Sequence, residues 1–203
     1  MITKTIVELE RLFDLLNQEF FEAKLINPII IVQRKVKKNT LGTCSTNPVW
    51  LNRKNEDKDK RYEITLSGEY LNRSNEEIIA TLLHEMIPLY CSQNDIKDTS
   101  NNSIYHNKKF KEEAEKRGLI IEKAKTIGWS VTKLNDKTKK LILKFKIDDS
   151  AFNYYRKSLI EVPKKKTIIY KYTCPDCGQK ISHYKEVNLI CGDCNKPYEK
   201  REE

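Results

Sequence analysis

The stretch NEEIIATLLHEMIPLY, residues 75–90, decides how the rest of the chain is interpreted. Ser74 precedes it and two glutamates follow in its first turn, a pattern that favours a helix start because a hydroxyl and carboxylates satisfy free backbone amides. The apolar residues that come next surround almost the whole helix, so we predict that it is buried. His84 and Glu85 are then polar groups on a buried helix, where they need a structural or chemical reason to be present.

His84 and Glu85 form the first half of a His-Glu-x-x-His motif. In that motif two histidines four residues apart share one helix face and bind one Zn²⁺, while the glutamate acts as general base toward the zinc-bound water. The residue four after His84 is Pro88, which has no donor atom for a metal. Proline also removes a helix hydrogen bond and is expected to bend the helix. The stretch is therefore an active site, an altered active site, or a coincidence of two residues.

The segments around this helix predict a small mixed domain. Apolar residues recur at helical spacing over residues 4–24, and residues 28–35, 41–52 and 61–71 have the composition of three strands. A polar loop then leads to a helix over residues 105–119, which begins beside His106 and is closed by a glycine. The fold class expected from this order is α+β, with helices and a short three-stranded sheet.

The net charge of +9 is concentrated in one part of the chain. Residues 123–166 carry 13 Lys+Arg and 4 Asp+Glu, whereas residues 1–122 and 167–203 are each neutral. This basic segment favours binding to a polyanion such as nucleic acid, and a solvated lysine-rich surface is the alternative. Within it, residues 130–134 and 139–147 predict a β-hairpin with one face made mostly of lysine. The candidate nucleic-acid-binding residues are Lys139, Lys140, Lys144, Lys146 and Trp129.

Four cysteines near the C-terminus predict a structural zinc site. The candidate ligands are Cys174, Cys177, Cys191 and Cys194. They form two Cys-x-x-Cys pairs separated by thirteen residues, and each pair is followed by a turn-forming residue, Gly178 or Asn195. Four thiolates suit a tetrahedral Zn²⁺ with no open position, and the metal would supply folding free energy that so short a segment lacks. We expect two short strands in this zinc ribbon, over residues 168–173 and 185–190.

Four more short motifs lie in other parts of the chain: NQEFFEAKL in the first helix, LGTCS in the strand region, His-x-x-x-Phe from residue 106, and Gly128-Trp129. With the helix of His84 and the terminal ribbon, they resemble the SprT-like family, which includes DNA–protein crosslink proteases. The resemblance implies a zincin-like metallopeptidase domain, with His84 and His106 as zinc ligands and Glu85 as catalytic base. The family's second ligand belongs where this chain has Pro88, so catalytic Zn²⁺ and peptidase activity are expected to be impaired. Asn107 stands where the family often has glycine, a tolerable change because asparagine also accepts unusual backbone angles.

We therefore predict a SprT-like metallopeptidase domain over residues 1–122, a basic β-hairpin and linker over 123–166, and a four-cysteine zinc ribbon over 167–203. By the resemblance, the partners would be DNA or another nucleic acid and protein substrates bound to it. The alternative is a non-enzymatic nucleic-acid-binding or regulatory protein in which the ribbon and the basic segment carry the function. The sequence shows neither a secretion signal nor a membrane span, so we expect a cytoplasmic monomer with reduced thiols and no membrane partner.

Overall fold

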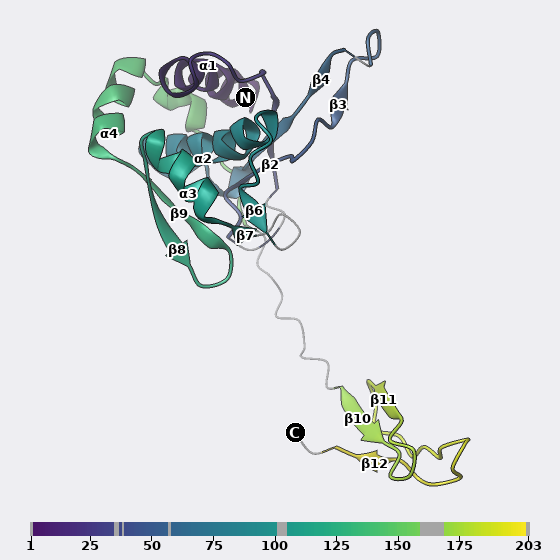
Figure 1. Ribbon diagram of the computed structural model, residues 1–203. Coiled ribbons are helices and arrows are strands. Elements are labelled where there is room, and N and C mark those ends of the chain that lie inside the picture. The colour runs from purple at the N-terminus through teal and green to yellow at the C-terminus, as the bar shows by residue number, and fades with distance from the viewer. Residues whose placement is uncertain are drawn as a thin grey trace. The chain divides into compact units, whose positions relative to one another are not determined.

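The chain divides into two compact units, residues 1–158 and 159–203. The computed structural model describes residues 2–34, 37, 39–56, 58–100, 105–158 and 169–201 (Figure 1). The helices of the first unit are α1 (Ile2–Phe21), α2 (Asn75–Gln93), α3 (Lys108–Lys116) and α4 (Asp136–Ile142), with single 3₁₀ turns η1 (Gly68–Tyr70), η2 (Leu143–Phe145) and η3 (Asp149–Phe152). Its strands are β1 (Ile29–Gln33), β2 (Gly42–Cys44), β3 (Trp50–Leu51), β4 (Lys60–Arg61), β5 (Glu63–Ser67), β6 (Thr99–Ser100), β7 (Tyr105–His106), β8 (Leu119–Ala124) and β9 (Gly128–Leu134).

A three-stranded sheet and the helices packed on it enclose the core of the first unit, which confirms the expected α+β class. The strand order is β1-β5-β2, with β1 parallel and β2 antiparallel to β5. Helix α2 contacts α1, β2, β5, β9 and α3, and its Leu82, Leu83, Met86 and Ile87 have no exposed surface. Burying each such side chain contributes roughly 1.5–3 kcal/mol, so apolar packing fixes the position of the helix that carries His84 and Glu85.

Helix α2 begins as its sequence predicts and continues through its proline. The hydroxyl of Ser74 accepts a hydrogen bond from the amide of Glu77, whose carboxylate accepts one from the amide of Ser74, which is a complete capping box. The helix then runs without interruption through Pro88 to Gln93. The missing amide at Pro88 weakens the helix by about 3 kcal/mol, and the burial of the neighbouring apolar side chains offsets that loss.

The prediction of a β-hairpin is wrong in its second half. Strand β9 does form, but it pairs antiparallel with β8, and residues 136–142 are the helix α4. The side chain of Asn135 caps this helix by accepting from the amide of Thr138, and buried Thr138 and Ile142 lie four residues apart on one helix face. The alternation of lysine and apolar residues fits a strand, but such short runs also satisfy helical spacing. Here the Asn135 cap and the burial of one face favour the helix.

A second sheet, in the order β6-β7-β9-β8, joins the basic segment to the first unit. Strand β7 pairs parallel with β9 at His106 and Gly128, so residues 105–106 belong to a strand and the predicted helix begins only at α3. Gly118 has a φ of +82° and ends α3, as its position after the helical pattern predicts.

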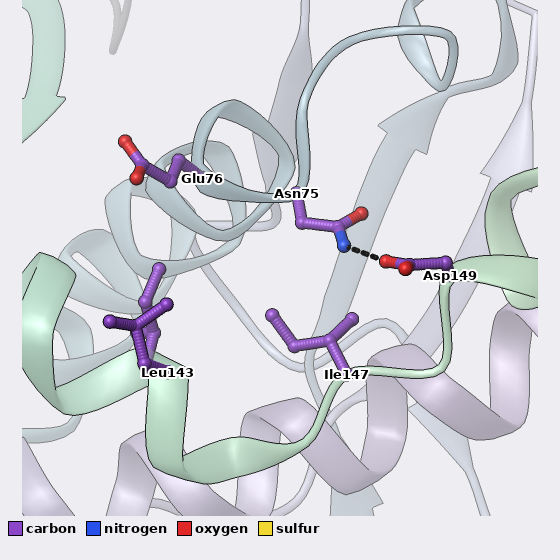
Figure 2. A pocket seen from close by; sticks show the side chains of 6 residues that line it. Asn75, Glu76, Leu143, Ile147 and Asp149 are labelled. Atoms are coloured by element: carbon purple, nitrogen blue, oxygen red, sulfur yellow. Dashed lines mark hydrogen bonds between the residues drawn. The ribbon is translucent and has the colours of Figure 1, made fainter.

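The segment after α4 returns to the start of α2. Figure 2 shows Asn75 at the first turn of α2 donating a 2.5 Å hydrogen bond to Asp149 of η3. A surface pocket of about 220 Å³ lies here, with Leu143 and Ile147 in its lining. His84 is nine residues further along α2 than Asn75, roughly 13 Å at 1.5 Å per residue, so this pocket is separate from the histidines.

The second unit is a small antiparallel sheet beside the four cysteines. Its strands are β10 (Tyr170–Thr173), β11 (Lys180–His183) and β12 (Glu199–Lys200), in the order β11-β10-β12. The first predicted strand is confirmed in part, whereas the one expected over residues 185–190 is wrong, since only Ile190 there forms a β-bridge. The chain turns back directly after the first cysteine pair, so residues 180–183 become the partner of β10. Within the described residues, no helix has the length and apolar character needed to cross a membrane.

Candidate metal centres

The structure brings His84 of α2 and His106 of β7 together. Their Nε2 atoms are 3.3 Å apart, and His84 is only 9% exposed. Two nitrogens bound to one tetrahedral Zn²⁺ at 2.0–2.1 Å lie roughly 3.3 Å from each other. The observed spacing therefore suits two ligands of a single ion, although the residues are 22 positions apart in sequence.

Phe110 of α3 holds both imidazole rings from one side. Its ring centroid lies 4.7 Å from that of His84 and 3.9 Å from that of His106, and its side chain has no exposed surface. Nδ1 of His84 is 2.7 Å from the hydroxyl oxygen of Thr132 in β9. The His-x-x-x-Phe pattern thus has a packing reason, because Phe110 closes the apolar wall of the histidine pair.

The backbone of His106 is positioned by a glycine and by the start of α3. Gly128 has a φ of +76°, and a Cβ there would stand 2.2 Å from the carbonyl oxygen of His106, so only glycine allows this approach. Asn107 caps α3 by accepting from the amides of Lys109 and Phe110. Asn107 does not need the backbone angles that glycine allows: its φ is −90° in extended backbone, and its role is capping.

Glu85 lies beside His84 in α2 and faces the edge strand β2. A Cβ at Gly42 would stand 3.0 Å from both Cγ and Oε1 of Glu85, so the absence of a side chain at Gly42 makes room for the carboxyl group. Burial raises the pKa of Glu85 to about 8. The neighbouring Cys44 thiol also has a raised pKa, first through burial and then through the charge of Glu85. Glu85 is therefore mostly protonated at neutral pH.

The two histidines are neutral at physiological pH. Burial, with a smaller effect from His106, lowers the pKa of His84 to about 3, and burial lowers the pKa of His106 to about 4. Neutral imidazole is the form that binds a metal ion. Nδ1 of His106 is buried and has no hydrogen-bond partner within the described part of the chain.

Among the residues that the structure describes, no third ligand accompanies the pair. Pro88, buried one turn further along α2, offers no donor atom. In the part of the chain that the structure describes, the four ribbon cysteines are the one group of three or more His, Cys, Asp or Glu residues whose donor atoms all lie within 4.8 Å of one another. Neither Glu85 nor Cys91, which lies seven residues after His84 on α2, therefore completes the site. The residues present do not fit the three-ligand zinc centre that the resemblance implies.

The four-cysteine site of the second unit does fit a zinc ion. Sγ of Cys177 lies 3.7 Å from Sγ of Cys191, close to the roughly 3.8 Å expected between two sulfurs bound at 2.3 Å to tetrahedral Zn²⁺. The amide of Gly178 donates to the carbonyl of Cys174, and the amide of Asn195 donates to that of Cys191. Gly178 and Asn195 have φ values of +72° and +53°, so the prediction that both end tight turns is confirmed.

The thiols of this cluster need a cation before all of them can ionise. Hydrogen bonds from the amides of Cys194 and Asp193 lower the pKa of Cys191 to about 7. A hydrogen bond with Cys177 and burial raise the pKa of Cys194 to about 12. One thiolate is therefore favoured and the next is opposed, which is the condition that a divalent ion relieves.

The predicted nucleic-acid-binding residues do not share a strand face. Lys139 lies 3.8 Å from the carboxylate of Glu76, and Lys146 has a left-handed φ of +48°. Lys140 and Lys144 are exposed and, with Lys137, follow the spacing of one helix face. The ring of Trp129 is half-buried in β9 and carries the ammonium group of Lys111 at 4.2 Å from its centroid.

The glycines of LGTCS and Gly128-Trp129 stand out in the sequence as motif residues, but their roles become visible only in the structure. Gly42 and Gly128 make room for Glu85 and for the His106 backbone, and a close backbone approach is a recognisable reason for glycine at such positions. The sequence does not reveal Thr132, and no local pattern points to it, because threonine is common in strands.

Comparison with known proteins agrees with this geometry. The family model described as the SprT-like family matches residues 9–132, which include His84, Glu85, His106 and the supporting residues Gly42, Phe110, Gly128 and Thr132. Searches of the curated proteins and of the solved structures gave no match. The matched region spans more than half of the chain and confirms the resemblance seen in its motifs. The chain belongs to the SprT-like family.

Proposed function

We propose that this chain has a metallopeptidase-like fold with an impaired peptidase centre, and that it acts on or near DNA. The observation that carries the first part is the histidine pair without a third ligand: two Nε2 atoms 3.3 Å apart, and a proline where the next donor belongs. A zinc ion held by two imidazoles lacks the three protein ligands of catalytic zinc sites.

Glu85 keeps its place beside the histidine pair. Gly42 makes room for its carboxyl group, and the packing of α2 holds the group there. Glu85 is therefore retained in position beside a ligand set that lacks a donor.

The proposed action near DNA rests on charge. Residues 123–166 hold the whole net charge of the chain, and Lys137, Lys140 and Lys144 present ammonium groups from one side of α4 and η2. Such a surface attracts phosphates without reading base sequence. By analogy with the family, DNA-bound or crosslinked proteins would be the substrates of an intact relative.

The competing function is that of a non-enzymatic nucleic-acid-binding or regulatory protein. The observation that favours it is the contrast between the two metal centres: the four-cysteine cluster fits Zn²⁺, while the histidine site lacks a ligand. In that case the ribbon and the basic surface would carry the activity, and the peptidase fold would serve as a scaffold.

A peptidase assay separates these functions. The full chain is incubated with Zn²⁺, DNA and a DNA-bound protein, beside the variants Pro88→His and Pro88→Ala. The alanine variant restores the helix amide without adding a ligand, so it isolates the effect of the donor atom. We expect cleavage by Pro88→His alone. Cleavage by the unaltered chain at the rate of Pro88→His would overturn the proposal of an impaired centre, and no cleavage by any variant would favour the non-enzymatic function.

A further inference from the structure

We infer that His84 and His106 form a polar clasp, a pair of buried imidazoles that ties helix α2 to strand β7 without a metal ion. Their Nε2 atoms are 3.3 Å apart and share a hydrogen bond. Two ligands of one zinc ion would have about the same spacing, so the donor set decides between the two roles. Within the described residues the pair lacks the third donor of a catalytic zinc site. The inference therefore rests on the proposed impaired centre and gives the pair another role.

Both nitrogens of His84 find their partners within the chain. Nδ1 lies 2.7 Å from the hydroxyl oxygen of Thr132, and Nε2 lies 3.3 Å from Nε2 of His106. A neutral imidazole has one donor and one acceptor nitrogen, while a hydroxyl and a second imidazole can each donate or accept. Either tautomer of His84 therefore makes both hydrogen bonds. A ligand histidine uses the protein for one nitrogen and the ion for the other, whereas here the chain supplies both partners.

Burial makes these hydrogen bonds important for stability. His84 is only 9% exposed, and the fully buried ring of Phe110 packs against both imidazoles. Water has little access to His84, so a nitrogen that loses its partner within the chain stays unpaired. Leaving a buried polar group unpaired raises the unfolding equilibrium constant about fivefold or more. The mutual hydrogen bond therefore stabilises the folded first unit.

The clasp joins segments that are distant in sequence. His106 is 22 residues from His84, and Thr132 is 48 residues from it. The two partners of His84 belong to β7 and β9, which pair with each other in the second sheet. Gly128 of β9 admits the backbone of His106 and so allows that pairing. The clasp thus fixes the second sheet against α2.

The consequence is a different metal requirement for the two units. The first unit holds its histidines in place through its own hydrogen bonds, whereas the ribbon depends on Zn²⁺ for its fold. The clasp also competes with metal binding. The Nε2 lone pair that accepts the hydrogen bond is the one that an ion would need.

The first test is a double-mutant cycle on the full chain, with the ribbon loaded with Zn²⁺ and no excess metal. His84→Phe, His106→Phe and the double variant are unfolded with urea, and the fluorescence of Trp50 and Trp129 reports the first unit. Phenylalanine keeps an aromatic ring, so each single variant mainly leaves the other histidine's Nε2 unpaired. We expect each single variant to raise the unfolding equilibrium constant about fivefold or more. The double variant should be at least about fivefold less destabilised than the product of the single effects.

His183 provides the matched control, because it is the third histidine of the chain and lies in the other unit. The effects of His84→Phe and His183→Phe on the first unit should multiply independently. Independent effects of His84→Phe and His106→Phe, within about twofold, would rule out the clasp.

The second test separates the clasp from metal binding. The urea midpoint of the first unit is measured for the unaltered chain and for Pro88→His, each with its ribbon loaded, with and without one further equivalent of Zn²⁺. We expect no shift for the unaltered chain and a higher midpoint for Pro88→His, because only that variant supplies a third donor. A rise in the unaltered chain would contradict both the clasp and the proposed impaired centre. No shift in either chain would contradict the proposed role of position 88 alone, and the double-mutant cycle would then decide the clasp.

Discussion

At the scale of single residues, Pro88 occupies the helix position from which a histidine side chain would reach the same ion as His84. The helix nevertheless continues through Pro88 to Gln93, with buried apolar side chains around the proline. His84 and Glu85 keep the burial and the neighbours of a prepared site, including Thr132 and Gly42. Compared with histidine, proline at position 88 lacks a donor atom for a metal and one backbone hydrogen bond.

Some of these site residues could be predicted from the sequence and others could not, for physical reasons. His84 and Glu85 stand out because polar residues on a buried helix are exceptional. His106 lies 22 residues from His84, and only the family resemblance connected the two, since no short-range periodicity does. Thr132 lies 48 residues away and looks like an ordinary strand residue, so its contact becomes visible only in three dimensions.

Replacing Glu85 with glutamine should stabilise the first unit at neutral and alkaline pH. Burial raises the pKa of Glu85 to about 8 from an ordinary value of 4.5, so the unfolded chain ionises this group before the folded chain does. The contribution of Glu85 to the free energy of unfolding is therefore fully present below pH 4.5 and is lost as the pH rises toward 8. The difference should reach roughly 3–5 kcal/mol at pH 8 and remain constant above it.

The measurement is urea unfolding of metal-free protein at pH 4, 6, 8 and 9. Trp50 and Trp129 are the two tryptophans of the chain, and both belong to the first unit, so their fluorescence reports that unit. A stability difference between Glu85→Gln and the unaltered chain that does not change with pH would show that Glu85 is not held protonated by the fold.

At the scale of elements, the accuracy of the sequence predictions depended on how many independent signals agreed. Helix α2 combines a capping box with an apolar surface all round, and its start is predicted correctly. The spacing of apolar residues over 139–147 fits both a strand and a helix. The side-chain cap at Asn135 favours the helix α4. In the ribbon, the glycine and asparagine turns were predictable from the cysteine spacing, whereas the partner of β10 was not.

The helical arrangement of the lysines gives a prediction for nucleic-acid binding. Lys140→Gln with Lys144→Gln removes two charges from one face of the α4–η2 segment. If both lysines contact phosphates, the slope of log affinity against log salt should fall by about 1.8 for duplex DNA. The matched control is Lys24→Gln with Lys109→Gln, which changes net charge equally at lysines paired with Glu22 and Glu112. Equal slopes for the two double variants would remove this face from the proposed DNA contact.

The ribbon should depend on its metal independently of the first unit. Cys174→Ser removes one of four thiolates and is expected to abolish tight Zn²⁺ binding and the fold of residues 169–201. The unfolding free energy reported by Trp50 and Trp129 should stay within about 0.5 kcal/mol of that of the unaltered chain, because both side chains lie in the other unit. A large change in that free energy would show that the two units are thermodynamically coupled.

At the scale of the whole molecule, the first unit extends beyond the region that the family model matches. The match ends at residue 132, while the unit continues to residue 158. The added segment is tied to α1: the hydroxyl of Thr5 donates to the carbonyl of Ala151 over 2.5 Å, and Arg11 donates to the carbonyl of Phe145 over 3.0 Å. The basic segment is therefore part of the packed unit up to residue 158, and truncation of the chain at residue 132 would expose part of α1.

We propose that the chain has one complete zinc site and one that lacks a ligand. The direct test is the zinc content per chain, measured by atomic emission after dialysis against a weak chelator, for the unaltered chain, Pro88→His and Pro88→Ala. We expect one Zn²⁺ per unaltered chain, one for Pro88→Ala and two for Pro88→His. Two tightly held ions in the unaltered chain, or one in Pro88→His, would contradict it.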